Sequence, residues 1–151
     1  MDKPLPDAVI ATAQSTETLE ASEPQGELTL RTLAMPADAN PAGDIFGGWV
    51  LSQMDIAGGM YAGQIAHGRV ATVAINAMTF IRPVFVGDVL CVYASTERIG
   101  RTSIAVHLEA WVLRSRQGGR VRVTDGIFVF VALDSQGKSR PLPDSLRNAG
   151  E

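Results

Sequence analysis

Apolar and polar positions divide the centre of the chain into five strand-like runs and one long apolar stretch. Residues 27–33 alternate between polar and apolar side chains, and four later runs at residues 70–80, 88–98, 102–114 and 121–133 are also strand-like, with turns between them. Residues 47–66 contain no proline and a single charge, Asp55, and their apolar side chains fall on nearly every side of a helix. This pattern predicts a buried helix, which the His67-Gly68 pair should end.

One helix between an early strand and four successive strands predicts an α+β domain, an antiparallel sheet curled around a central helix. In the run at residues 102–114, one face is filled by Ile104, Val106, Leu108, Ala110 and Val112. The other face includes His107, Glu109 and Trp111, which we expect to meet solvent or a partner chain. A single helix covers only one face of the sheet, so an exposed Trp111 indicates an oligomer.

Composition favours one globular domain at residues 27–143, flanked by a mobile arm at residues 1–26 and a polar tail at residues 144–151. The chain has 151 residues, is 46% hydrophobic and has a net charge of −3, which gives no reason to expect nucleic acid or an anionic membrane as a partner. Cys91 is the only cysteine, so no intrachain disulfide forms. Without a signal peptide or a membrane-spanning run, the expected location is cytoplasmic.

The most informative segment is the loop before the helix, where Asp44 stands three residues ahead of Gly47 and Gly48. Helix starts offer unpaired N–H groups and a partial positive charge, and glycines let a substrate oxygen come close to them. A carboxylate and an oxyanion pocket facing one carbonyl would suit acyl transfer. Asp44 could equally be the helix N-cap. Two histidines are too few for a usual catalytic zinc site, and no serine elbow is present.

The sequence resembles the hotdog-fold acyl-CoA thioesterases, most closely the YciA-type bacterial acyl-CoA hydrolases. The segments that carry the resemblance run from about residue 28 to 143 and lie at residues 30–36, 43–49, 52–55, 65–69, 78–83 and 86–88. The resemblance implies a five-stranded sheet around the helix, and paired protomers with active sites at their interface. It also implies a homodimer or a homohexamer of three dimers. The implied reaction hydrolyses acyl-CoA to a free acid and coenzyme A, with no other cofactor and no metal.

By the resemblance, Asp44 is the catalytic carboxylate, and the amides of Gly47 and Gly48 polarise the thioester carbonyl. Asp44 could activate water or attack the carbonyl directly, and we favour water activation. Substrate contacts are assigned to Asn40, Phe46, Thr72, Asn76, Arg82, Pro83, Arg101, Thr102 and Ser103.

Several of these assignments have a structural alternative. Asn76 could orient the attacking water from the partner protomer or satisfy a backbone group, and Thr72 shares its strand face by the two-residue period. Asp55 is expected to pair structurally across the dimer. Arg82, Arg101 and their turns are candidates for coenzyme A phosphate or pantetheine contacts, with Lys138 and Arg140 as further phosphate candidates.

Two functions from other classes remain open. The chain could be a non-catalytic acyl-CoA binding or sensing module, although it carries no attached output domain. It could also be a hydratase or dehydratase relative. Those enzymes use a histidine paired with a carboxylate, whereas neither His67 nor His107 lies in the Asp44 loop.

Overall fold

The computed structural model describes residues 23–114 and 119–148. Most of the predicted N-terminal arm, at residues 1–22, lies outside this part, as do residues 115–118 and 149–151. The domain bounds given above therefore stay predictions. In the described part, no helix is long and apolar enough to cross a membrane.

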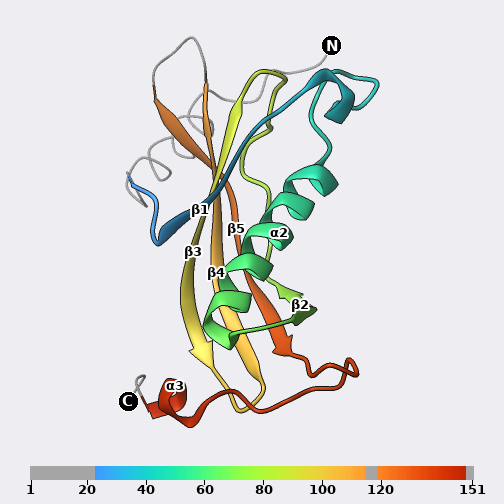
Figure 1. Cartoon of the computed structure of the whole chain (residues 1–151). Helices are drawn as coiled ribbons and strands as arrows, with labels where there is room; N and C mark the ends of the chain where they lie inside the picture. Colours follow the sequence, from blue (N-terminus) through green and yellow to red (C-terminus); the bar gives the residue numbers. More distant parts are fainter. Residues whose placement is uncertain (1–22, 115–118, 149–151) are drawn as a thin grey trace, which may run out of the picture.

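A single antiparallel sheet wraps one side of a long helix (Figure 1). The strands lie in the order β1-β3-β4-β5-β2, and every neighbouring pair is antiparallel. The elements in chain order are β1 (Glu27–Leu33), the 3-10 helix η1 (Pro36–Asp38), α2 (Gly47–Ala66), β2 (Val70–Asn76), β3 (Val89–Ile99), β4 (Ser103–Leu113), β5 (Arg120–Ala132) and α3 (Asp144–Asn148). The predicted α+β architecture is confirmed.

Most element bounds agree with the predicted ones, and β2 is the exception. It ends at Asn76 rather than at residue 80. Ala77 has φ +54°, in the left-handed region that a non-glycine residue seldom adopts, so the chain leaves the sheet there. The segment that follows runs past the start of α2. The short helix α3, in the predicted polar tail, was not expected from the sequence.

The helix buries a stripe against the sheet and leaves its opposite side exposed. The buried positions are Val50, Met54, Ala57, Gly58, Ala62 and Ala66, which follow the i, i+4 spacing of one helix face. They meet a sheet face on which Ile104, Val106, Leu108, Ala110 and Val112 are all buried, as predicted. Ile56 and Met60 are half exposed, so the prediction of a helix buried all round is wrong for the single chain.

The outer face of β4 does not expose its tryptophan. Trp111 and Glu109 are each only 3% exposed, which corrects the expectation that both meet solvent or a partner. The indole N–H of Trp111 donates to Oε2 of Glu109 at 3.2 Å, and the backbone N–H of Gln25 donates to the same oxygen at 2.8 Å. The segment before β1 thus reaches this face. Exposed apolar side chains lie instead on α2 and on the edge strand β2, at Ile56, Met60, Val73 and Ile75.

The C-terminal end of α2 is closed by the predicted His67-Gly68 stop. His67 adopts the left-handed conformation, with φ 53°, and its N–H donates to the Gln64 carbonyl. Nη2 of Arg140 donates to the Ala66 carbonyl at 2.7 Å. These contacts satisfy carbonyls that a helix end otherwise leaves unpaired.

Candidate functional site

The loop before α2 is held in shape by the side chain of Asn40. Its Oδ1 accepts hydrogen bonds from the backbone N–H groups of Ala42, at 3.0 Å, and Asp44, at 3.1 Å. The backbone N–H of Asn40 donates to the Asp44 carbonyl at 2.6 Å. Gly43 has φ +93°, which suits glycine. Asn40, predicted to contact substrate, therefore shapes the loop with its side-chain oxygen.

The carboxylate of Asp44 is exposed, and it accepts no hydrogen bond from any residue in the described part. Asp44 is not the helix N-cap, because that position belongs to Phe46, which makes no side-chain capping bond. The capping alternative is therefore wrong. The backbone of Asp44 pairs with Phe85, and the N–H of Ile45 donates to the Val84 carbonyl at 3.0 Å. The fold thus fixes the backbone while leaving the acid free to react.

Two amides at the helix start have no acceptor within the described part of the chain. The first N–H groups bonded inside the helix are those of Trp49 and Val50, both to the Phe46 carbonyl. The N–H groups of Gly47 and Gly48 precede them and carry the positive end of the helix dipole. No atom of the described residues lies within 4 Å of the place where a Cβ on Gly48 would stand. This end of the helix has room for a ligand oxygen.

A cleft of about 330 Å³ opens beside Gly47. It is lined by Ile45, Gly47, Val50, Phe80, Ile81, Arg82, Pro83, Val84 and Val123. The structure thus brings predicted Arg82 and Pro83 to the helix start, although both also have structural contacts. Nη1 of Arg82 donates to the Arg122 carbonyl at 3.1 Å, and the Pro83 carbonyl accepts from Nη2 of Arg114 at 2.9 Å. The guanidinium of Arg114 also lies over the Phe85 ring.

Thr72 and Asn76 do not share a strand face, which corrects the expectation from the two-residue period. The pairing register shifts between Thr72 and Ala74, so Thr72 lies opposite Phe130 and Asn76 opposite Ile127. Directly paired residues project to the same side of a sheet. Thr72 is therefore on the helix side and Asn76 on the outer side, because a β-bulge reverses the alternation.

Asp55 finds its partner in its own chain. The hydroxyl of Thr72 donates to Oδ1 of Asp55 at 2.5 Å, joining the middle of α2 to the edge strand. Asp55 was predicted to pair with a residue of the partner protomer, and here its partner is Thr72 of the same chain. Both residues line a second cleft, of about 470 Å³, with Ile56, Gly59, Met60, Gly68, Arg69, Val70 and Phe130.

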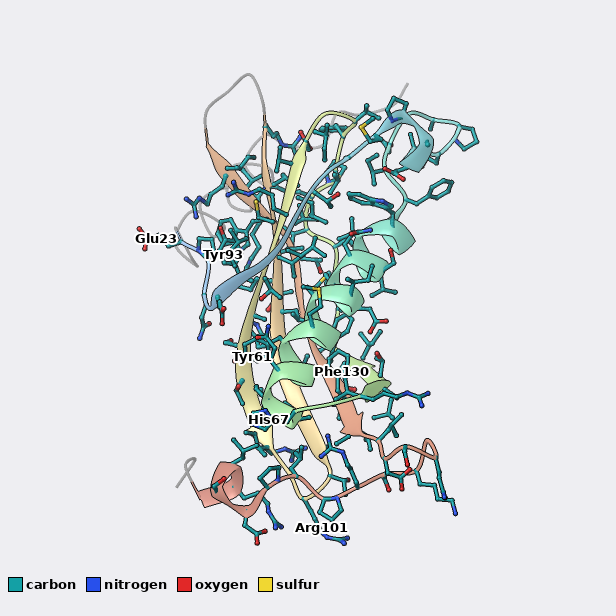
Figure 2. The ribbon with its side chains drawn as sticks, in the orientation of Figure 1. Glu23, Tyr61, His67, Tyr93, Arg101 and Phe130 are labelled. Carbon is teal, nitrogen blue, oxygen red and sulfur yellow. The ribbon has the colours of Figure 1, made fainter. Side chains whose placement is uncertain are left out.

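The turn at Arg101, Thr102 and Ser103 lies at the opposite end of the molecule from Asp44. Figure 2 shows Arg101 beyond the end of α2 that His67 marks. The N–H of Leu142 donates to the Arg101 carbonyl at 2.8 Å, and the N–H of Ala132 donates to the Thr102 carbonyl at 2.9 Å. A helix of 20 residues is about 30 Å long. Within one chain these three residues therefore lie far from Asp44, and the structure does not bring them together with it.

Neither histidine approaches the loop. His67 ends α2, and Nε2 of His107 lies 3.2 Å from Oδ2 of Asp125, between β4 and β5. This histidine–carboxylate pair is therefore separate from Asp44. Among residues 23–114 and 119–148, no group of three or more His, Cys, Asp and Glu side chains could hold a metal ion.

The sequence did not single out the apolar wall of the Gly47 cleft. A Cβ built on Gly47 would lie 3.5 to 3.9 Å from three ring atoms of Phe80. Phe80 had been placed in a strand, and its position depends on the turn at Ala77. The only local signal was a bulky residue shortly before Arg82-Pro83, where a proline favours extended chain.

An antiparallel sheet around one helix, with an exposed carboxylate beside the helix start, defines a hotdog domain. The family model described as the thioesterase superfamily matches residues 42–118. A relative from Salmonella typhimurium, the acyl-CoA thioester hydrolase YciA, is 57% identical over 123 residues, covering 80% of this chain and 92% of the relative. The chain belongs to the thioesterase superfamily.

Solved structures agree with this assignment. One is a hexameric broad-specificity acyl-coenzyme A thioesterase in which an aspartate is replaced by alanine. It matches with TM-score 0.77 and 50% identity, covering 82% of this chain and 91% of the other. A hexameric hotdog-fold thioesterase of Campylobacter jejuni matches with TM-score 0.78 and 38% identity, covering 84% and 98%.

Proposed function

We propose that this protein hydrolyses acyl-CoA thioesters to a free carboxylic acid and coenzyme A. The observation that carries the proposal is the pairing, at one helix start, of an exposed acid with two unpaired amides in a thioesterase-superfamily chain. Asp44 is the acid, and Gly47 and Gly48 supply the amides. The Salmonella relative is named as an acyl-CoA thioester hydrolase, which supports the choice of substrate.

In the proposed reaction, the thioester oxygen lies against the amides of Gly47 and Gly48. Asp44 takes a proton from water as the water oxygen bonds to the carbonyl carbon. The amides stabilise the negative charge that develops on the carbonyl oxygen. The carbon–sulfur bond then breaks, and the coenzyme A thiolate leaves and takes up a proton. No metal or further cofactor enters this scheme.

The decisive experiment follows thiol release from short-, medium- and long-chain acyl-CoAs by the wild type, Asp44→Asn and Glu97→Gln. Glu97 is an exposed carboxylate on β3 and serves as the matched control. We expect Asp44→Asn to lose activity by about a hundredfold to ten-thousandfold and the control to keep it. If the wild type bound acyl-CoA but released no thiol, the sensing module would replace this proposal.

A single turnover in ¹⁸O-labelled water separates the two possible roles of Asp44. If Asp44 activates water, the acid formed in the first turnover carries the label. If Asp44 attacks the carbonyl and water then opens the anhydride at the Asp44 carbonyl, the first acid takes an unlabelled oxygen from the carboxylate and the label enters Asp44, so label in Asp44 identifies direct attack. We expect label in the acid.

We further propose that the chain works as a homodimer or a homohexamer in the cytoplasm. The exposed Ile56, Met60, Val73 and Ile75 lie on α2 and on the sheet-edge strand β2. Such apolar patches mark association sites. Light scattering should give two or six times the protomer mass of 16.1 kDa, and the mass of a single chain would contradict the assembly.

A further inference from the structure

We infer that the cleft beside Gly47 receives the acyl chain of the substrate and that Phe80 limits the length of that chain. This inference rests on the proposed thioesterase function. Gly47 forms part of the cleft wall. If the Gly47 amide faces the thioester oxygen, the first carbons of the acyl chain must leave the carbonyl within a few bond lengths of this cleft.

The chemistry of the walls fits a hydrocarbon chain. Seven lining side chains are apolar: Ile45, Val50, Phe80, Ile81, Pro83, Val84 and Val123. The floor is closed, because Val50, Val84 and Val123 are at most 2% exposed. Among the described residues that line the cleft, Arg82 is the one that is charged, and none is an acid. Arg82 donates to the Arg122 carbonyl.

The other large clefts of the described part are less suitable for such a chain. The cleft at Asp55 and Thr72 includes Arg69 and is about eight residues along the helix from Gly47. Another, of about 580 Å³, is lined by His67, Gly68, Arg69, Leu133, Asp134, Ser135 and Arg140 at the far end of α2. A third, of about 390 Å³, is lined by Glu23, Pro24, Tyr93 and Arg120. All three contain charged groups of both signs, whose desolvation by a hydrocarbon would be costly.

The size of the cleft sets a range of chain lengths. Its volume is about 330 Å³, roughly twice that of a ~150 Å³ cavity that holds one six-carbon benzene ring. The cleft therefore has room for at most about twelve carbons by the same comparison. Phe80 is 47% exposed and its ring lies beside Gly47, so it forms a solvent-facing part of the cleft wall. Removing that ring would open the cleft, and enlarging Ile81 would narrow it.

The test measures kcat/KM on saturated acyl-CoAs of two to sixteen carbons for the wild type, Phe80→Ala, Ile81→Phe and Leu28→Ala. Leu28 is the control because it is an apolar residue of β1, about as exposed as Phe80, that does not line the cleft. For the wild type, we expect kcat/KM to rise with chain length and level off by about twelve carbons. Phe80→Ala should raise the ratio of sixteen-carbon to eight-carbon activity about tenfold, and Ile81→Phe should lower it. Leu28→Ala should keep the wild-type profile.

Circular dichroism and a thermal melt establish that each variant is folded. If either Phe80→Ala or Ile81→Phe does not fold, the chain-length profile of the other variant tests the inference. An active wild type whose profile is unchanged in the folded variants would overturn the chain-length inference alone. A wild type that releases no thiol from any acyl-CoA would overturn the proposed function itself.

Discussion

The start and the middle of α2 use glycine for opposite reasons. At Gly48, a Cβ would meet nothing within 4 Å, whereas at Gly58 it would stand 2.7 Å from Cζ of Phe130 and 2.9 Å from Cδ1 of Leu108. The middle is glycine because the helix packs closely on the sheet. The start has free space that a larger residue could fill, at a place where glycine carries a cost in helix stability.

This difference separates a packing requirement from a functional one within a single helix. Substitutions at the start should change turnover more than stability, because an added methyl group meets no described atom at Gly48 and only ordinary van der Waals contacts at Gly47. Substitutions in the middle should do the reverse. For each substitution below, the measurement shows whether turnover or the free energy of unfolding changes more.

Among substitutions in α2, the largest effect is expected from Gly47→Pro, which removes one amide that has no acceptor in the described part of the chain. Proline is favoured at the first helical position, and Phe46, with ψ 134°, has the extended conformation that suits a residue before proline. The fold should survive while turnover falls by about a hundredfold to a thousandfold. Gly47→Ala keeps the N–H and serves as the control in the same thiol-release measurement. Full turnover by a folded Gly47→Pro variant would remove this amide from the proposed oxyanion site.

Gly58→Ala should be the most destabilising small change in the middle of the helix. Its methyl group would overlap the Phe130 ring and the Leu108 side chain. We expect a net loss of about 1–3 kcal/mol in the free energy of unfolding, measured by urea denaturation. Gly59→Ala is the matched control, because its nearest contact is an ordinary 3.8 Å to Cε1 of Phe130. Equal stabilities of the two variants would contradict the packing argument.

Thr72→Val tests whether the Asp55–Thr72 hydrogen bond serves stability or turnover. The bond involves an exposed threonine, so its loss should cost only about 1 kcal/mol of unfolding free energy. We expect turnover to stay within about threefold of the wild type, since the bond lies well along the helix from Gly47. A tenfold fall in turnover with unchanged stability would instead place this pair in the active site.

Local pattern was enough to predict the scaffold. The bounds of α2 follow from proline, charge and the His67-Gly68 stop, and the inner face of β4 follows from strict alternation. The Asp44 loop was also found from sequence, because a carboxylate ahead of two glycines at a helix start is a local signal.

Features that depend on distant contacts were not predictable in this way. The buried Trp111 depends on Glu109, whose carboxylate also accepts a hydrogen bond from Gln25, 84 residues away. The sheet faces on which Thr72 and Asn76 lie depend on a β-bulge, and no residue type in β2 predicts that bulge. Phe80 reaches Gly47 only because Ala77 turns the chain out of the sheet.

The smallest effect on stability is expected from Gly48→Ala, and its sign is informative. Alanine is better than glycine in a helix by up to about 1 kcal/mol, and the space above Gly48 is open, so the free energy of unfolding should rise. Turnover should fall, because the new methyl group would stand where the thioester oxygen approaches the amide. Gly59→Ala offers a similar helix benefit farther along α2 and should leave turnover unchanged.

A more stable and less active Gly48→Ala variant would mean that this glycine is kept for the substrate rather than for the fold. A more stable variant with full turnover would instead limit the oxyanion site to the amide of Gly47.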